Sequence, residues 1–263
     1  MAEALRRRKW TRQLSLAALL LTLGAIAASI IGAIGSGQGA WHFRIGFTIL
    51  QYSLFAAAVG IILALVALIL GRRGGHGRLR LVNILAIVAG LAFLLYLGSL
   101  IATARSVPAI HDITTNLDDV PKFYRLVVRE DNLRSIPDLG RPQLAALPPR
   151  ERWKEVHRQS YGDLRTVRLP WNVAETVRRA EALARERGWE VVTSDPQLGI
   201  VEAVDTSLFF RFKDNVLVRV RQAPAGGSLV DMRSISRVGG SDVGVNAKRV
   251  RSFLADLQQE QQG

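Results

Sequence analysis

The residues best equipped for chemistry lie in the stretch RSISRVGGSDVGVNAKRVRSFL, from Arg233 to Leu254. Arginines and the free N–H groups at the start of a helix bind phosphate or carboxylate groups. Ser241 and Asp242 can instead cap the amphipathic helix that follows. In that case Arg233 or Arg237 is the expected ionic partner of Asp242. The stretch therefore predicts either a strand-to-helix junction held by caps and ion pairs, which we favour, or an anion-binding site.

Alternation in the preceding strand patterns predicts a sheet with one apolar and one basic face, because neighbouring side chains of a strand point to opposite sides. The apolar face takes alternate residues of LFFRF, from Leu208, and of NVLVRVR, from Val216. Nearby acids, namely Glu202, Asp205 and Asp231, are expected to pair with the basic face. Such a face is typical of a solvated, salt-bridged surface, and the alternative is an anion-binding surface. The candidate residues for binding an anion or a partner are Arg211, Arg219, Arg221, Arg233, Arg237, Ser241, Asp242, Asn246 and Arg249.

Signatures of catalysis and of metal binding are weak. The chain has no cysteine, which excludes disulfides, a thiol nucleophile and cysteine-rich metal sites. GGSDVG departs from the G-x-S-x-G nucleophile motif, and neither a phosphate-binding loop nor a dinucleotide fingerprint is found. We therefore assign no catalytic residue, metal site or cofactor. The alternative is an envelope hydrolase or transferase that uses His111, Asp214 and Asp242.

The elements that must position these residues form an α+β domain over residues 165–263. RTVRLP predicts a short strand, and Asn172 with Glu175 resembles a capping box at the start of a helix. Gly188 is expected to end that helix in a left-handed conformation. WEVVTSD, GIVEAVDT, LFFRF, NVLVRVR and SLVDMRSISR predict further antiparallel strands, with a tight turn at Lys213, Asp214 and Asn215.

A second main helix closes this domain, and a linker precedes it. Apolar residues at helical spacing predict the closing helix, and they share one face. Residues 106–164 read as a linker that contains a short helix, PPRERWKEVHRQ, with prolines at its start. The predicted apolar positions of the closing helix are Ala247, Val250, Phe253, Leu254 and Leu257.

Residues 1–105 predict a three-helix transmembrane region. Three uncharged apolar runs, at about 14–34, 49–70 and 81–102, each have the ~20 residues that cross a bilayer as a helix. This region holds 11 lysines and arginines and a single acid, Glu3, whereas the rest holds 24 basic and 21 acidic residues. The net charge of +13 therefore belongs mainly to the membrane flanks, and we predict no nucleic-acid partner.

Basic flanks also predict the orientation of the spans. RRRKWTR precedes the first run and GRRGGHGRLR joins the second and third, and such segments stay on the cytoplasmic side. We expect a bacterial inner-membrane protein with a cytoplasmic N-terminus and a periplasmic C-terminal domain. Small residues spaced by four predict close helix packing within the three-helix unit, or a homo-oligomer as the alternative. They are Gly24, Ala28 and Gly32 in the first run and Ala56, Gly60 and Ala64 in the second.

Four segments together resemble one protein family. They are IHDITTNLDDVPKF, ALARERGWEVV, FFRFKDNVLVRV and RSISRVGGSDVGVNAKRVRSFLADL. This pattern, over residues 110–257, resembles the DUF1499 family, whose members often carry N-terminal membrane spans. The resemblance implies a fold unit without an assigned reaction. The family commonly has two aspartates where this chain has Asp214 and Asn215, and other branches carry a cysteine near the first segment.

The expected function follows from the membrane region and the basic surface. We expect a non-catalytic periplasmic domain that binds an envelope partner, either a protein or an anionic lipid or glycan. The alternatives are the hydrolase or transferase above and an accessory subunit of a transport or respiratory complex.

Overall fold

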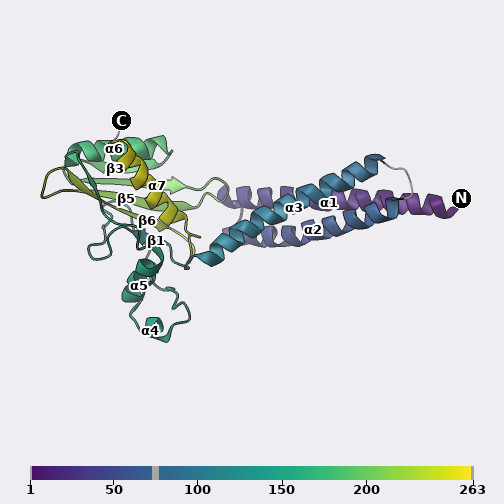
Figure 1. The fold of residues 1–263 in the computed structure, drawn as a ribbon, viewed down its shortest axis with the longest axis horizontal. Coiled ribbons are helices and arrows are strands. Elements are labelled where there is room, and N and C mark those ends of the chain that lie inside the picture. Colours follow the sequence, from purple (N-terminus) through teal and green to yellow (C-terminus); the bar gives the residue numbers. More distant parts are fainter. Residues whose placement is uncertain (1, 73–76, 262–263) are drawn as a thin grey trace. The chain divides into compact units, whose positions relative to one another are not determined.

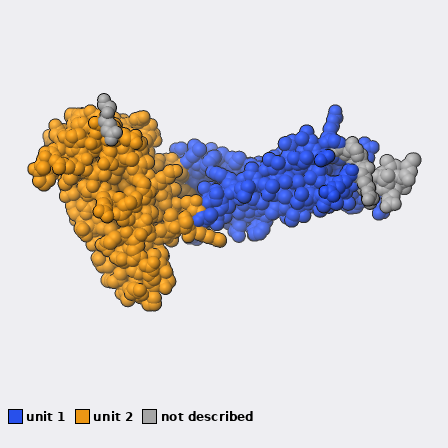
Figure 2. Space-filling model, viewed as in Figure 1, with its two compact units in different colours: residues 1–102, 208–211 blue, residues 103–207, 212–263 orange. Residues whose placement is uncertain are grey.

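The structure, a computed structural model, describes residues 2–72 and 77–261. It has two compact units, which Figure 2 shows in different colours. The first comprises residues 1–102 with 208–211, and the second comprises residues 103–207 and 212–263.

Three long helices make up most of the first unit: α1 (Ala2–Gly37), α2 (Phe43–Gly71) and α3 (Gly77–Ser106) (Figure 1). Each is long and apolar enough to cross a membrane, as the sequence predicted. Their outward side chains are apolar, with Leu20 71% and Leu95 72% exposed. An apolar surface of this kind suits contact with lipid rather than with water.

Small residues let α1 and α2 pack closely. A Cβ atom at Gly60 would lie 2.5 Å from Thr22 Oγ1, and one at Gly32 would lie 3.0 Å from Ile49 Cγ2. The predicted packing role is therefore supported at these two glycines. It is wrong for Gly24, where an added Cβ would meet no described atom within 4 Å. The helix turns Gly24 away from α2, because the contacting face of α1 passes through Ala18, Thr22, Ala25 and Ser29 instead.

The second unit is an α+β domain built on an antiparallel sheet of order β1-β6-β5-β4-β3, with β2 also paired to β6. Helices α6 and α7 pack on this sheet, α6 against β3 and β5, and α7 against β6 (Figure 1). The strands are β1 (Asp112–Thr114), β2 (Val167–Leu169), β3 (Glu190–Asp195), β4 (Ile200–Thr206), β5 (Lys213–Gln222) and β6 (Ser228–Ser236). The helices are α4 (Pro142–Ala145), α5 (Pro149–Tyr161), α6 (Val173–Glu186) and α7 (Val245–Gln259).

Local signals in the sequence set the helix ends of this domain. Asn172 Oδ1 accepts a hydrogen bond from the Glu175 N–H at 2.9 Å, which confirms the predicted cap of α6. Gly188 follows α6 with φ 75°, the left-handed conformation expected of it. Val216 and Val218 of β5 are buried in the same core as the helices. The five predicted apolar positions of α7 are all buried as well.

The segment LFFRF is not a strand, and this corrects the predicted face of Leu208, Phe210 and Phe212. Residues 207–212 form the loop between β4 and β5, closed by the Ser207 N–H, which donates to the Phe212 carbonyl at 2.9 Å. Arg211 adopts a left-handed conformation with φ 54°, which no strand residue does. The prediction failed because the apolar composition of LFFRF is also typical of a strand. The predicted turn at Lys213, Asp214 and Asn215 is also wrong, because these residues begin β5.

The sheet face opposite the helices is partly covered by the segment that follows β1. The carboxylate of Glu202 is fully buried and accepts the backbone N–H groups of Arg125 and Leu126, each at 2.9 Å. Asn215 Nδ2 donates to the Val127 carbonyl at 3.0 Å. The predicted solvated basic face is therefore in part an interior layer, where polar side chains of the sheet bind the backbone of this segment.

Candidate functional site

Several polar residues of the stretch from Arg233 to Leu254 build a buried polar network between β6 and α7. Asn246 is completely buried; its Nδ2 donates to the His111 carbonyl at 3.0 Å and to Ser236 Oγ at 2.9 Å. Ser234 Oγ donates to Asn246 Oδ1 at 2.6 Å. Arg249 Nη1 donates to Ser234 Oγ at 2.9 Å. The hydroxyl, amide and guanidinium groups of the motif thus satisfy one another inside the fold.

Asp242 accepts N–H groups at the start of α7, as predicted, but none of the ion pairs found among the described residues joins it to an arginine. Its Oδ1 accepts the Gly244 N–H at 2.9 Å and its Oδ2 accepts the Asn246 N–H at 2.8 Å. Burial is the main reason that the pKa of Asp242 is raised, and the negative charge of Asp214 adds to the effect. The predicted pairing with Arg233 or Arg237 is wrong, because strand register directs those side chains to the other face of the sheet.

Arg233 and Arg237 bind partners of their own. Arg233 forms two hydrogen bonds to Asp112, Nε to Oδ1 at 2.9 Å and Nη2 to Oδ2 at 2.6 Å. Arg237 Nε donates to Asn215 Oδ1 at 2.7 Å. Both arginines therefore hold neighbouring segments of the domain together rather than a common anion.

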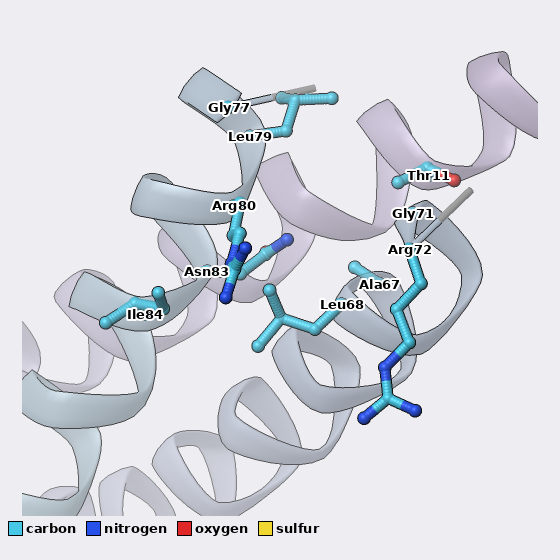
Figure 3. A pocket seen from close by; sticks show the side chains of 10 residues that line it. All are labelled: Thr11, Ala67, Leu68, Gly71, Arg72, Gly77, Leu79, Arg80, Asn83 and Ile84. Atoms are coloured by element: carbon cyan, nitrogen blue, oxygen red, sulfur yellow. The ribbon is translucent and has the colours of Figure 1, made fainter. Parts of the chain in front are cut away.

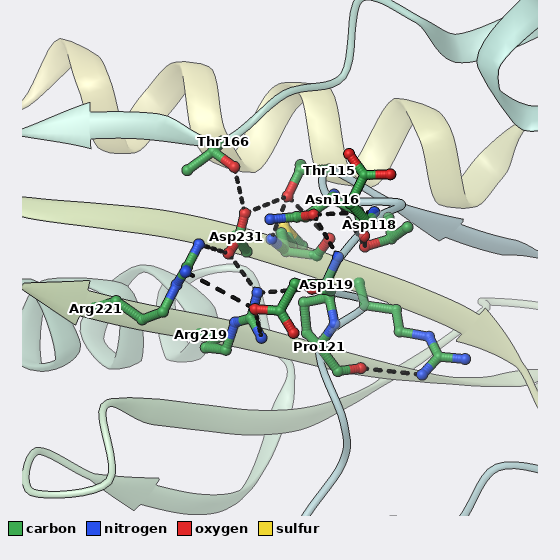
Figure 4. A network of polar contacts seen from close by, with 12 residues as sticks. Thr115, Asn116, Asp118, Asp119, Pro121, Thr166, Arg219, Arg221 and Asp231 are labelled. Carbon is green, nitrogen blue, oxygen red and sulfur yellow. Dashed lines mark hydrogen bonds and ion pairs between the residues drawn. The ribbon is translucent and has the colours of Figure 1, made fainter. Parts of the chain in front are cut away.

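Arg219 and Arg221 share the carboxylate of Asp231 (Figure 4). Their Nη2 atoms lie 2.7 and 2.8 Å from Asp231 Oδ2, while Thr166 donates to Oδ1. Burial raises the pKa of Asp231, but the hydrogen bonds from Thr166 and Arg219 and both positive charges outweigh it, so the pKa lies below its usual value. The predicted pairing of Asp231 with the basic face is confirmed.

The other candidate residues differ in burial and in their partners. Ser241 and Arg211 are exposed. His111 is 4% exposed, and its Nδ1 lies 3.4 Å from the Gly240 carbonyl. Asp214 is bound by Arg249 at 2.7 Å. The nine candidate residues are thus distributed over several pairings, and whether any of them binds an external anion stays a prediction.

A different pocket opens between the segment after β1 and the end of α5. Its volume is about 520 Å³, within the range of pockets that hold small ligands. Its lining is mostly polar, and we name it the His157 pocket. It is lined by Thr115, Asn116, Leu117, Asp118, His157, Arg158, Tyr161, Gly162, Leu164, Arg165 and Thr166.

His157 is the most deeply buried titratable group that lines this pocket, with 1% of its surface exposed. Burial lowers the pKa of His157 to about 4, so the ring is neutral at physiological pH. Its Nε2 accepts the Thr114 N–H at 3.1 Å, which leaves the ring hydrogen on Nδ1. Nδ1 is buried and has no hydrogen-bond partner among the described residues. The ring therefore keeps one unused donor.

The His157 pocket has a hydrogen-bonded wall and a charged rim. Thr115 and Thr166 line it and also bond to Asp231, so the ion pairs of Figure 4 support that wall. Arg165 is exposed at the rim and forms no ion pair within the described part of the chain. Asp118 is the lining carboxylate. The free Nδ1–H of His157 and a cation at the rim suit an oxygen-rich, anionic group.

A family model describes more than half of the chain. The match covers residues 112–257, and its description is "Protein of unknown function (DUF1499)". The chain belongs to the DUF1499 family. The resemblance carried by the four segments is thereby confirmed, and no curated protein matches the chain.

Sequence reasoning missed the His157 pocket of the DUF1499 domain. One signal was available: Trp153, His157 and Tyr161 follow one another at a spacing of four, on one face of α5. Their rings lie edge to face, with centroids 5.8 and 5.7 Å apart. A histidine on the apolar face of an amphipathic helix is buried by necessity. The ring hydrogen of His157 is on Nδ1 because the Thr114 N–H binds Nε2, and no local sequence pattern predicts this contact.

Proposed function

We propose that this DUF1499 protein is a membrane-anchored binding protein. Its three helices span the bacterial inner membrane with the N-terminus in the cytoplasm, and its DUF1499 domain lies in the periplasm. There the domain binds a carboxylate or phosphate group of an envelope lipid, glycan or protein. The basic flanks of the helices support this orientation.

The unused Nδ1–H of His157 carries this proposal. A buried donor without a partner costs free energy, about 1–3 kcal/mol, and a ligand acceptor removes that cost. Arg165 supplies positive charge at the rim. Thr115 and Thr166 line the wall, with their hydroxyl groups bonded to Asp231. Binding rather than catalysis is supported because Asp214, one of the acids considered for a hydrolase, is already held by Arg249.

The test uses the full-length protein in detergent, with inorganic phosphate and glucuronate as probes and calorimetry for the dissociation constants. We expect His157→Phe to weaken binding of at least one probe about tenfold, since a hydrogen bond to a charged group is lost. Arg165→Gln should weaken it about fivefold. Arg150→Gln is the matched control, because Arg150 lies on α5, is exposed and does not line the pocket.

Two results would overturn the proposal. One is that, for each probe, the wild type, His157→Phe and Arg150→Gln all bind with the same affinity. The other is an unchanged ¹⁵N signal of the His157 ring when either probe is saturating, because the proposal requires a new hydrogen bond at Nδ1.

A further inference from the structure

A second pocket lies within the first unit, where α2 ends and α3 begins (Figure 3). Its volume is about 520 Å³. Side chains from all three long helices contribute to it, and we name it the Asn83 pocket. It is lined by Thr11, Ala67, Leu68, Gly71, Arg72, Gly77, Leu79, Arg80, Asn83 and Ile84.

Asn83 is the buried polar residue of this pocket, with 1% of its surface exposed. Its Nδ2 donates to Ser15 Oγ at 3.0 Å. Ser15 Oγ in turn donates its single hydrogen to the Thr11 carbonyl at 2.8 Å, so Ser15 must accept from Asn83. This fixes the amide orientation. Asn83 Oδ1 is buried and has no partner among the described residues.

Two arginines line the pocket beside this amide, and none of the described lining residues is acidic. Arg72 and Arg80 line the pocket and are exposed. Figure 3 shows Arg80 beside Asn83 and Arg72 on the other side of Leu68. The sequence of the first 105 residues contains a single acid, Glu3, against 11 lysines and arginines. The guanidinium groups therefore suit an anion supplied from outside the chain.

Apart from Thr11 and two glycines, the rest of the lining is apolar. Leu68 and Ile84 contribute alkyl surface beside the two arginines. A free phosphate ion would gain nothing from such surface, whereas the glycerol and first acyl carbons of a lipid would bury against it. The pocket also lies at the ends of helices long enough to span a membrane, which is where headgroups lie.

We infer that the Asn83 pocket binds the headgroup of an anionic phospholipid. The phosphate would lie between Arg72 and Arg80, and Asn83 would hydrogen-bond to the glycerol hydroxyl or an ester oxygen. The inference rests on one part of the proposed function, namely that the three helices span a membrane. It is independent of the orientation of the spans and of the His157 pocket.

The experiment places the full-length protein in phosphatidylcholine nanodiscs that contain a minority of phosphatidylglycerol, and native mass spectrometry measures the retained lipid. We expect Arg80→Gln to lower phosphatidylglycerol retention about fivefold or more, since one phosphate contact is lost. Arg80→Lys, which keeps the charge, should recover part of it. Leu68→Trp, which fills the pocket without changing charge, should also lower retention.

Arg78→Gln is the matched control. This substitution removes the same charge from the same end of α3, but Arg78 does not line the pocket, so retention should change less than twofold. If Arg78→Gln and Arg80→Gln lowered lipid retention equally, the effect would come from general surface charge, and the inference would be overturned. The inference would also be overturned if inorganic phosphate displaced the lipid and occupied the pocket to the same extent, because the pocket would then be a site for free phosphate.

The failure of the inference can be distinguished from that of the proposed function. Loss of probe binding at His157 with intact lipid retention would reject only the proposed function. Retention that is the same in the wild type and Leu68→Trp, with normal folding by circular dichroism, would reject only the Asn83 pocket.

Discussion

Arg249 of α7 and Asp214 of β5 form a buried ion pair with an N–O distance of 2.7 Å. The same guanidinium binds Asp205 of β4, and Asp205 lies directly opposite Asp214 in the strand register. Two carboxylates that face each other across neighbouring strands repel, and one arginine from the final helix compensates both. The helix is thereby tied to two strands through charge as well as through apolar packing.

Replacing Arg249 should destabilise the domain strongly. Arg249→Met removes the shared cation and leaves Asp205 and Asp214 facing each other, so we expect a loss of about 3–5 kcal/mol in the free energy of unfolding. Urea denaturation of the full-length protein in detergent, followed by hydrogen exchange of β5 peptides, measures this loss. Arg251→Met is the control on the same helix. Its ion pair with Asp163 is half exposed, and its loss should cost about 1 kcal/mol or less.

His157 should make stability depend on pH. The unfolded chain takes up a proton near the ordinary histidine pKa of 6.5, whereas the folded ring takes one up only at about 4. As pH falls from 6.5 to about 4, the free energy of unfolding should therefore decrease, by about 3 kcal/mol. His157→Gln should remove this part of the decrease. Tyr161→Phe should retain it, because burial raises the pKa of Tyr161 to about 12, far above this range.

Asp242 and Arg237 should act independently. Asp242→Ala removes two acceptors from the first turn of α7 and should cost about 0.5–2 kcal/mol. Arg237→Ala breaks the hydrogen bond to Asn215. Because the two side chains do not pair, the double variant should cost the sum of the single losses within about 0.5 kcal/mol, measured by denaturation. A coupling larger than about 1 kcal/mol would restore the pairing expected from the sequence.

The raised pKa of Asp242 gives a second readout at the same position. A buried carboxyl holds its proton more tightly in the folded state, so stability from this group should decrease as pH rises above 3.8, the ordinary pKa of an aspartate. Asp242→Asn keeps one acceptor, cannot ionise and should show a smaller decrease than the wild type. A steeper decrease in Asp242→Asn would contradict the direction of the pKa shift.

The exposure of individual residues decides which positions suit a cysteine-labelling test of the membrane orientation. Ser228 is fully buried and the Ser36 hydroxyl bonds to the Gly32 carbonyl, so cysteines at these two positions would label poorly. Cysteines at Gln38 and Gln197, both exposed, should react with an impermeant thiol reagent on intact spheroplasts. A cysteine at the exposed Gly77 should react only after lysis. Labelling of Gly77→Cys in intact spheroplasts would invert the proposed orientation.

Glycines on the two faces of the helices should respond differently to substitution. Gly60→Leu would place a side chain within 2.5 Å of Thr22 Oγ1 and force α1 and α2 apart, with a cost of about 1–3 kcal/mol. Gly24→Leu meets open space within the chain and should leave the thermal midpoint in detergent unchanged. If Gly24→Leu nevertheless abolishes a crosslinked dimer, that face of α1 contacts a second copy.

Local patterns in the sequence were sufficient for the elements and their ends. The uncharged runs identified α1, α2 and α3, since crossing ~30 Å of hydrocarbon demands about 20 apolar residues in a row. Asn172 and Gly188 marked the ends of α6, because capping depends on residues within a few positions of each other. The strand predicted for LFFRF was wrong because local composition was the only guide. Its composition matches a strand, but two hydrogen bonds between Ser207 and Phe212 close the segment as a loop.

Partners across the fold were decided only by the tertiary structure. The sequence by itself determined that this region is rich in arginines and acids, that a helix follows Asp242, and that the chain resembles the DUF1499 family. Strand register and helix docking then decided that Arg249 meets Asp205 and Asp214, and that Thr114 occupies Nε2 of His157. The physical reason is range: propensity, capping and hydrophobic periodicity act over a few residues, whereas an ion pair or a pocket depends on which distant segments pack together.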